Sequence, residues 1–396
     1  MEEVVIVSTV RTPIGSLGGV YKNTSAVELG TIAATEVLNR SLIQPEEVDT
    51  VIFGNVLQAG LGQNPARQIS IHTGIPNTVP AMTINEVCGS GLKSVILASQ
   101  AIQVGDAKVV LAGGTENMSQ APYLLKDHRF GSKMGDIQAI DSLVHDGLTD
   151  AFNHHHMGVT AENVAERYHV SREEQDEFAF HSQMKAATAQ ENGLFDEEIV
   201  PVTIQVKRQS QVLTQDEYIR KETTIEKLQK LRPAFKPNGS VTPGNASGIN
   251  DGAAAVLLMS KSEAEKRQIP YLATIKGYAE VGSDPEIMGY APYGAVQKVF
   301  EKTNFTKDDI DLFEFNEAFA SQSIALVRDL ELPVEKVNIN GGAIALGHPI
   351  GASGSRILVT LLHAMKKNQK KRGLATLCVG GGIGIAMIIE RAEQTV

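Results

Sequence analysis

Four residues of this chain have side chains and sequence surroundings that suit catalysis, and Cys88 is the first of them. It is one of only two cysteines among 396 residues and stands in NEVCGSGLKS, just before a helical apolar pattern. A helix N-terminus carries partial positive charge and free N–H groups, which favour a thiolate and could hold an oxyanion beside it. The small residues at 89–91 leave room for a substrate carbonyl. Cys88 is therefore a candidate nucleophile, and the alternative is a buried cysteine that packs as a small apolar side chain.

The other three candidates lie in the second half of the chain, at the ends of expected strands and helices. Cys378, in LCVGGGIGIAM, is either a core residue at a strand end or a second reactive thiol. His348, in GHPIGASGSR, precedes a proline that biases it away from helical geometry where a helix begins. Asn316, in FEFNEAFAS, could hold a water, donate to an enolate oxygen or cap a turn. Two thiols facing one cavity would suggest a nucleophile and a base.

Two other kinds of site have little support. The consecutive histidines at 154–156 do not share one helix face and have no partner at zinc-binding spacing, so no metal is expected. The glycine runs lack G-x-G-x-x-G after the first strand, which argues against a dinucleotide site.

Charge and composition restrict the partners and the compartment. A formal net charge of -10 argues against binding to nucleic acid or to an anionic membrane. Two cysteines are too few for a disulfide framework, so a cytoplasmic location is expected. No charged leader or apolar signal region precedes the first strand-like run, and no apolar stretch of about 18 residues predicts a membrane span.

Short β-branched runs alternate with helical stretches, as in VVIVSTV, the amphipathic segment 26–40 and VDTVIFGNV. This alternation predicts an α/β fold in which strands are buried between layers of helices.

The sequence also contains an internal repeat. The segment LIQPEEVDTVIFGNV from Leu42 aligns without a gap on NFTKDDIDLFEFNEA from Asn304. At the same offset, the Gly-Ser-Gly after Cys88 falls within the Gly-Ala-Ser-Gly of GHPIGASGSR. A repeat with so long a period indicates a duplicated domain.

The repeat divides the chain into two halves and an insertion. We expect one half from residues 1–118 together with 249–270, and the other from residues 271–396. Between them, the polar segment 119–248 could bind a long ligand. It contains an expected helix that begins after Ser171, with Glu174 at the capping-box position, and stops at Asn192.

Together these features resemble the thiolase family, and within it the short-chain acetyl-CoA C-acetyltransferases. The resemblance spans the chain and is carried by VVIVSTVRTPIGSLGG, NEVCGSGLKS, LAGGTENMS, HMGVTAENVAE, VTPGNASGINDGAAA, FNEAFA, GGAIALGHPIGASG and CVGGGIGIAM. It implies duplicated halves in a layered α-β-α-β-α core, with an inserted loop domain. It also implies the reversible Claisen condensation of two acetyl-CoA molecules to acetoacetyl-CoA and CoA. Coenzyme A thioesters would be substrates, no permanently bound cofactor is expected, and the subunits would form a homodimer or homotetramer.

The resemblance implies a role for each candidate residue. Cys88 matches the nucleophile that takes the acetyl group, and His348 matches the base that activates its thiol. Cys378 matches the acid/base that removes a proton from C2 of the second acetyl-CoA. Asn316 matches a residue whose bound water, with His348, stabilises the enolate oxygen. The backbone N–H groups of Cys88 and Gly380 match the other oxyanion hole.

The resemblance also predicts where coenzyme A would bind. Arg220 matches a residue near the nucleotide end, and Ser247 matches one that bonds the pantetheine chain. The apolar walls and the acyl pocket would come from Leu148, His156, Met157, Phe235, Met288 and Phe319. Three departures from the family pattern lie beside this region and bear on cofactor affinity and acyl-chain tolerance: Ile219, Ala291 and Tyr293.

Three alternatives stay open beside this interpretation. A 3-ketoacyl-CoA thiolase of fatty-acid degradation would accept longer chains, and the local HMG sequence favours the short-chain branch instead. Ketoacyl-carrier-protein and hydroxymethylglutaryl-CoA synthases share the duplicated fold but lack a second reactive cysteine. A non-catalytic carrier would be expected to lack Cys88 or His348, and the sequence has both.

Overall fold

The computed structural model describes residues 2–392; Met1 and residues 393–396, at the outer ends of the two expected halves, lie outside the described residues. The strands are β1 (Val4–Arg11), β2 (Gly15–Ser16), β3 (Thr50–Gly54), β4 (Ala81–Ile84), β5 (Val109–Asn117), β6 (Tyr123–Leu124), β7 (Ile140–Asp141), β8 (Val202–Val206), β9 (Gln209–Leu213), β10 (Asn250–Ser260), β11 (Ala273–Gly282), β12 (Leu312–Phe315), β13 (Arg372–Val379) and β14 (Ile383–Arg391). The α-helices are α1 (Ala26–Asn39), α2 (Pro65–His72), α3 (Ser90–Val104), α4 (Met157–Arg167), α5 (Arg172–Glu191), α6 (Ile225–Gln229), α7 (Lys261–Lys266), α8 (Pro292–Thr303), α9 (Ala320–Asp329), α10 (Ala343–Leu346) and α11 (Ile350–Lys367).

The main sheet has two arms of the same design. Its order is β12-β13-β14-β11-β1-β10-β5-β3-β4, with β2 beside β10. Strands β1 and β11 meet antiparallel in the middle. Outward from them, each arm has two antiparallel pairings and then a parallel one, which joins β5 to β3 and β13 to β12. The predicted duplication of α/β halves is confirmed by this order.

The sequence repeat occupies equivalent places in the two arms. A short 3₁₀ turn, Pro45–Glu47, precedes β3, and its counterpart Lys307–Asp309 precedes β12 at the same spacing. Both strands then pair parallel with the next strand inward. The residue ranges proposed for the halves and the insertion stay a prediction, because a shared sheet order does not fix where one unit ends.

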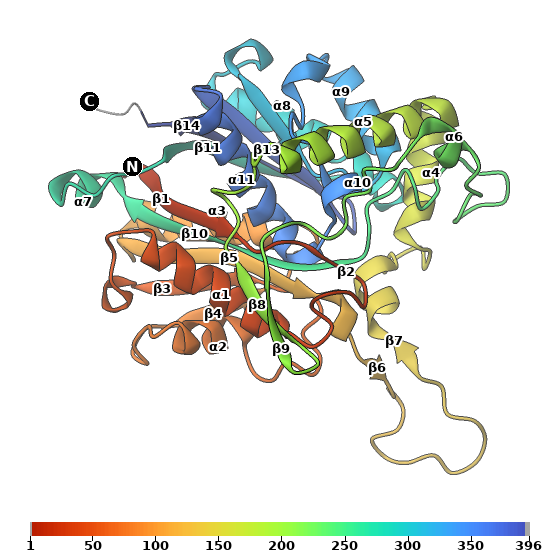
Figure 1. Cartoon of the computed structure of the whole chain (residues 1–396), viewed down its shortest axis with the longest axis horizontal. Helices are drawn as coiled ribbons and strands as arrows, with labels where there is room; N and C mark the ends of the chain where they lie inside the picture. Colours follow the sequence, from red (N-terminus) through yellow and green to blue (C-terminus); the bar gives the residue numbers. More distant parts are fainter. Residues whose placement is uncertain (1, 393–396) are drawn as a thin grey trace.

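Helices lie in three layers around the two arms (Figure 1). Helices α3 and α11 pack against each other and contact strands of both arms, so they form the central layer. Helices α1 and α2 cover the outer face of the arm that contains β3, β5 and β10, and α8 covers β11 and β14. The predicted α-β-α-β-α layering is therefore confirmed.

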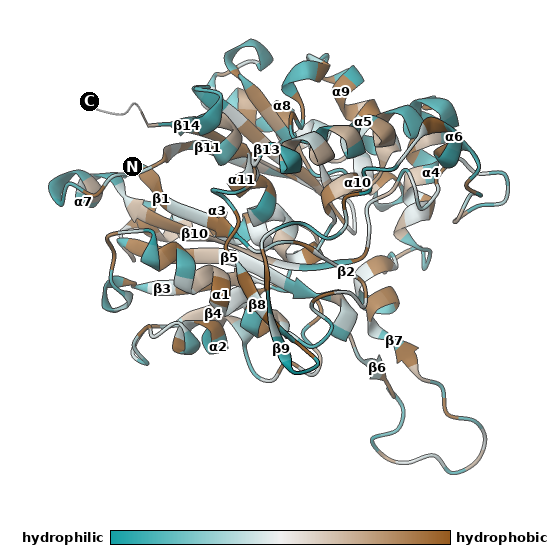
Figure 2. Cartoon of the chain, in the orientation of Figure 1, coloured by the Kyte–Doolittle hydropathy of each residue, from teal (hydrophilic) through white to brown (hydrophobic). Residues whose placement is uncertain are grey.

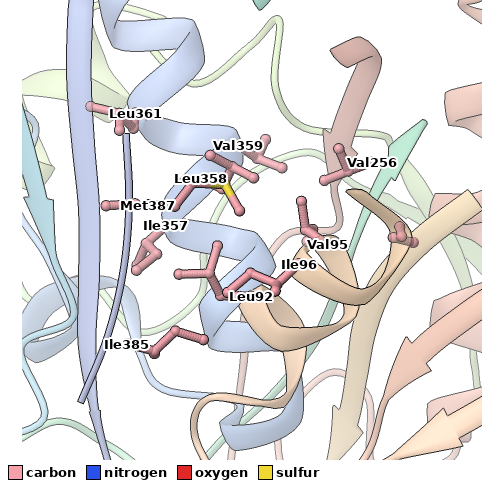
Figure 3. Packing of buried hydrophobic residues seen from close by; sticks show 14 of the residues in the cluster. Leu92, Val95, Ile96, Val256, Ile357, Leu358, Val359, Leu361, Ile385 and Met387 are labelled. Carbon is pink, nitrogen blue, oxygen red and sulfur yellow. The ribbon is translucent and has the colours of Figure 1, made fainter. Parts of the chain in front are cut away.

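The alternation of side chains along each strand builds separate cores on the two faces of an arm. Val256 and Leu258 of β10 face the central helices, whereas Leu257 and Met259 face the outer layer. Figure 3 shows residues of α3 and α11 meeting strand residues from both arms in the central core. The colouring in Figure 2 follows this pattern, with brown on the inner strands and teal on outer helical surfaces. Burial on both faces of a strand explains its nearly continuous apolar sequence.

The two central helices approach each other closely at their first turns. A Cβ atom added to Gly91 of α3 would lie 2.6 Å from the backbone nitrogen of Ser355 in α11. One added to Gly354 of α11 would clash with the backbone of Leu92. Only residues without a side chain allow this contact.

The segment expected to be an insertion, 119–248, is rich in helices. Helix α5 begins after Ser171 with both hydrogen bonds of the predicted capping box to Glu174 present, and Asn192 is its C-cap. The loop between β6 and β7 extends away from the rest of the chain (Figure 1). Among residues 2–392, no helix has the length and apolar character needed to cross a bilayer.

A buried arginine ties this segment to the core. The guanidinium of Arg11, at the end of β1, makes two hydrogen bonds to Asp216, of 2.7 and 2.9 Å, and one of 2.6 Å to Glu198. All three side chains are buried. A buried charge needs such partners because its loss of hydration is otherwise uncompensated.

We predict that Arg11→Met lowers the free energy of unfolding by about 3–5 kcal/mol, because it leaves two carboxylates buried without their cation. Chemical denaturation monitored by circular dichroism measures the change. Lys366→Met is the matched control, since it removes the exposed ion pair between Lys366 and Glu197; a change below about 1 kcal/mol is expected there. Equal effects of the two substitutions would contradict the prediction.

Candidate active site

The chemically capable residues lie at the ends of elements that surround one cavity. Cys88 immediately precedes the N-cap of α3, and His348 immediately precedes the N-cap of α11. Asn316 follows β12, and Cys378 is near the end of β13. The cavity has a volume of about 470 Å³ and is lined by Ser16, Leu17, Cys88, Met118, Gly147, Leu148, His156, Met157, Tyr218, Phe235, Pro243, Ala246, Ser247, Gly248, Ile249, Met288, Ala318, Phe319, His348 and Ile350. Thiol and imidazole thus reach a common space from two helix starts that pack together.

The backbone at Cys88 is bent sharply. Val87 has φ of 45°, a left-handed conformation that a β-branched residue rarely adopts. Interactions with the backbone N–H groups of Gly380 and of Cys88 itself lower the pKa of the thiol. Burial opposes this and has the larger effect, so the net pKa of Cys88 is raised to about 11. The expectation that the helix start makes this sulfur anionic is therefore wrong for the free protein, in which the neutral thiol prevails.

A buried carboxyl group lies behind the site. Glu116 of β5 accepts hydrogen bonds from the backbone nitrogens of Val56, Leu57 and Gly351, at 3.0, 3.1 and 2.9 Å. Burial raises its pKa to about 7. Because Gly351 is in the first turn of α11, Glu116 fastens β5 to the helix that follows His348. Its charge also adds to the raised pKa of Cys88.

We predict that alkylation of Cys88 by iodoacetamide accelerates roughly tenfold per pH unit from about pH 7 to about pH 10, because the thiolate fraction rises in that proportion below the thiol pKa. The rate is measured by mass spectrometry in a Cys378→Ser background, so that one thiol remains. A rate that levels off near neutral pH would show that the site ionises Cys88 without substrate.

His348 is held as a neutral ring. Its Nδ1 lies 2.5 Å from the Oγ of Ser353, which donates to the carbonyl oxygen of Pro349 at 2.9 Å. Since that hydroxyl proton is used, Ser353 accepts from Nδ1–H and leaves Nε2 of the imidazole as the proton acceptor. Burial, with a smaller effect of the Arg356 charge, lowers the pKa of His348 to about 3.

We predict that Ser353→Ala slows acylation of Cys88 about tenfold or more, since the imidazole loses the partner that fixes its tautomer and orientation. Rapid-mixing measurement of CoA release from acetyl-CoA reports this step. The control is Ser355→Ala, which removes a buried hydroxyl of the same helix that bonds the Ala352 carbonyl. A wild-type acylation rate in Ser353→Ala would contradict the assignment.

Cys378 is buried deeper than Cys88. Its Sγ donates to Oε1 of Gln322 at 2.9 Å. Burial raises the pKa of Cys378 well above its usual range, and the nearby charge of a Cys88 thiolate raises it further. It packs in an apolar cluster with Met157, Met288 and Phe319, all of which line the cavity. Neither thiol is part of a disulfide.

Asn316 faces the imidazole. Its Nδ2 lies 3.4 Å from both ring nitrogens of His348. Its Oδ1 is buried and has no hydrogen-bond partner within the described part of the chain. The adjacent Glu317 fixes this turn, because its carboxylate accepts from Ser182 Oγ at 2.6 Å and Asn338 Nδ2 at 2.8 Å.

Most of the residues expected to contact coenzyme A line the cavity, and Arg220 does not. The residues that do are Leu148, His156, Met157, Phe235, Ser247, Met288 and Phe319. The His156 ring stacks on Phe235 with centroids 4.8 Å apart, and burial lowers the pKa of this histidine. The Arg220 guanidinium instead lies over the ring of Tyr218, a cavity residue, at 4.8 Å.

The three departures from the family pattern are not among the residues that line the cavity. Ile219 packs beside the cluster that contains Phe195 and Leu346. Ala291 is buried, and its carbonyl carbon and oxygen would clash with a Cβ at Gly384. Tyr293 stacks on Tyr290 with centroids 5.2 Å apart. Any effect on coenzyme A binding would therefore be transmitted through packing, and it stays a prediction.

Sequence reasoning missed four residues of this site. Ser353 could have been identified from the sequence, because it lies in the glycine-rich segment that follows His348. Tyr218 and Glu116 lie beside or within recognised motifs but had no distinguishing pattern. Gln322 gave no signal, since a single glutamine in a helix is usually exposed. Among the described residues, no group of three or more His, Cys, Asp or Glu side chains could hold a metal ion.

Comparisons with known proteins agree with this geometry over nearly the whole chain. Residues 4–262 match the family profile described as "Thiolase, N-terminal domain", and residues 269–391 match "Thiolase, C-terminal domain". A probable acetyl-CoA acyltransferase of Staphylococcus aureus (strain COL) is 55% identical over 392 residues, which cover 99% of this chain and 100% of the relative.

Solved structures show the same similarity. The Bacillus anthracis acetyl-CoA acetyltransferase has 46% identity and a TM-score of 0.97, with 99% of each chain covered. The human mitochondrial 3-ketoacyl-CoA thiolase has 45% identity and a TM-score of 0.96, also with 99% of each chain covered. Its complex with CoA has a TM-score of 0.95 at 45% identity and covers 99% of this chain and 98% of that one. The chain therefore belongs to the thiolase family and is an acyltransferase.

Proposed function

We propose that this thiolase is an acetyl-CoA C-acetyltransferase that condenses two acetyl-CoA molecules to acetoacetyl-CoA and CoA, reversibly, through an acetyl group on Cys88. The observation that carries the proposal is the shared cavity of Cys88 and His348, with Cys378 in the apolar cluster at its wall. A covalent acyl-enzyme divides a difficult condensation into two easier steps.

The first step transfers the acetyl group. His348 Nε2 takes the Cys88 proton as the sulfur attacks the thioester carbonyl. The N–H groups of Cys88 and Gly380, whose interactions lower the pKa of the Cys88 thiol, donate to the oxyanion that forms beside the sulfur. The bond to the CoA sulfur breaks, and the departing thiolate takes the proton of Cys378. Acetyl-Cys88, imidazolium and the Cys378 thiolate remain.

The second step forms the carbon–carbon bond. The Cys378 thiolate removes a proton from C2 of the second acetyl-CoA. The enolate oxygen faces the His348 imidazolium and a water held by Asn316, whose buried Oδ1 has no partner among the described residues. C2 attacks the acetyl carbonyl, the Cys88 sulfur leaves, and it recovers its proton from His348. The α-proton of a thioester is weakly acidic, so the base depends on this stabilisation of the enolate.

The residues that line the cavity support coenzyme A as the carrier of the acyl group. The predicted apolar contacts Leu148 and Phe235, and the predicted pantetheine contact Ser247, line it. Arg220 lies over Tyr218, where a guanidinium at the rim could meet the phosphate-bearing end of the cofactor. Two unbridged thiols in one site fit a reducing cytoplasm. We also propose a homodimer or homotetramer, and the division into halves 1–118 with 249–270 and 271–396 around the insertion 119–248.

A broader-range 3-ketoacyl-CoA thiolase is the second candidate, favoured by the 45% identity to the human mitochondrial enzyme. Thiolysis rates on 3-ketoacyl-CoAs of about four to sixteen carbons separate the two. We expect kcat/KM to be highest at four carbons and to fall by about tenfold or more at eight, because Met157 and Met288 limit the cavity beside Cys88. A flat or rising series would favour the second candidate.

A further inference from the structure

A buried glutamine contacts one of the two thiols of the site. Gln322 lies in the first turn of α9 and is 1% exposed. Burial of a carboxamide is costly unless both of its ends are hydrogen-bonded. Here both ends are used, and both partners belong to the catalytic set: the carboxamide links the Cys378 thiol to the backbone of Asn316.

The orientation of the carboxamide is fixed by its neighbours. Its Nε2 donates to the carbonyl oxygen of Asn316 at 3.2 Å. A carbonyl oxygen can only accept, so the Oε1 of Gln322 must face the other way, toward the sulfur. The Cys378 Sγ lies 2.9 Å from this Oε1 and donates its proton to it.

A neighbouring glycine makes room for this side chain. A Cβ at Gly289 would lie 2.9 Å from the Cβ of Gln322 and 3.4 Å from its Oε1. Gly289 follows Met288, a residue of the cavity wall. Gly289 therefore has a physical role, which is to leave room for the side chain of Gln322 beside Cys378.

We propose that Gln322 is a positioning residue for Cys378: its Oε1 accepts from the thiol, fixes the direction of that side chain, and keeps the sulfur protonated until the departing CoA thiolate takes the proton. This inference rests on the proposed function. A carbonyl oxygen beside the sulfur stabilises S–H and opposes the thiolate, so the thiolate that forms during turnover is a stronger base toward C2 of the second acetyl-CoA. Cys378 is thus a thiolate only between the departure of CoA and the removal of the C2 proton from the second acetyl-CoA.

The test separates the two half-reactions in the full-length protein. In Gln322→Met, which keeps the length of the side chain and removes its acceptor, the burst of CoA release from acetyl-CoA should stay within about twofold of wild type. Exchange of the C2 protons with deuterium oxide and acetoacetyl-CoA synthesis should both fall about tenfold to a hundredfold, since both require a correctly placed base. The matched control is Ser323→Ala, which removes a buried hydroxyl in the same turn that donates to the carbonyl oxygen of Phe319, at the start of its own helix. This variant should leave both half-reactions unchanged.

Gln322→Glu gives a second measurement if the methionine variant does not fold. A carboxylate beside the sulfur opposes the thiolate more strongly than an amide does, so C2 exchange should be slow at neutral pH and should recover as pH rises. Loss of burst and exchange in equal proportion, or wild-type exchange in the variants, would overturn the role of Gln322. Failure of the proposed function is distinguishable, because wild-type protein would then show no acetyl group on Cys88.

Discussion

Cys88→Ala is expected to leave no covalent acetyl group on the protein after incubation with acetyl-CoA, and to lower acetoacetyl-CoA synthesis and thiolysis by about 10⁴-fold or more. In the proposed mechanism Cys88 supplies the sulfur that accepts the acetyl group, and the only other cysteine of the sequence, Cys378, is fully buried. Intact-protein mass spectrometry measures the adduct, and CoA release measures the turnover.

The matched control for this loss is Cys378→Ser, which retains Cys88. In that variant the acetyl group should appear on the peptide that contains Cys88. An adduct of equal amount in Cys88→Ala would show that the acetyl group goes elsewhere, and the mechanism would fail at its first step.

Cys378→Ser is expected to lose condensation and C2 proton exchange by about 10²–10⁴-fold, the usual contribution of a general base. A serine hydroxyl is far less acidic than a thiol, so it neither protonates the departing CoA readily nor returns as a base. Acetylation should persist, slowed by less than about tenfold, because in the proposed mechanism His348 and the N–H groups of Cys88 and Gly380 serve that step and are unchanged. Deuterium incorporation into acetyl-CoA and rapid-mixing assays of CoA release measure the two effects.

If the Cys378→Ser variant condensed at the wild-type rate, the general base would have to be another residue. His348 would then be the next candidate, since it lines the same cavity and has an unprotonated Nε2. Ser323→Ala serves again as the packing control.

The parts of this molecule that depend on local pattern could be predicted from the sequence. The apolar runs gave the strands, the capping box of Ser171 and Glu174 marked the start of α5, and the repeated segments revealed two arms of one design. Cys88 and His348 were recognisable because small residues beside a helix start are unusual surroundings for a thiol or an imidazole.

The rest depends on which distant segments meet, and local pattern does not contain that. Gln322 matters because α9 brings it against β13, and Glu116 because β5 ends beside the first turn of α11. The charge of the resting site also depends on burial: a helix start alone favours a thiolate, but the surrounding protein removes enough water to reverse the balance at Cys88. The contact of Arg220 with Tyr218 likewise could not be foreseen, and the role of Arg220 at the nucleotide end of coenzyme A stays a prediction.

The glycine contact between α3 and α11 has a consequence for motion. Cys88 and His348 lie just before the N-termini of α3 and α11. These helices contact each other backbone to backbone at Gly91 and Gly354, within the close-packed central core. Because no side chain separates the two helices there, a change in their separation would disrupt this contact, and we expect the spacing of Cys88 and His348 to change little during turnover. We therefore expect any opening and closing during turnover to occur at the cavity walls supplied by the segment 119–248, which include Met157 and Phe235.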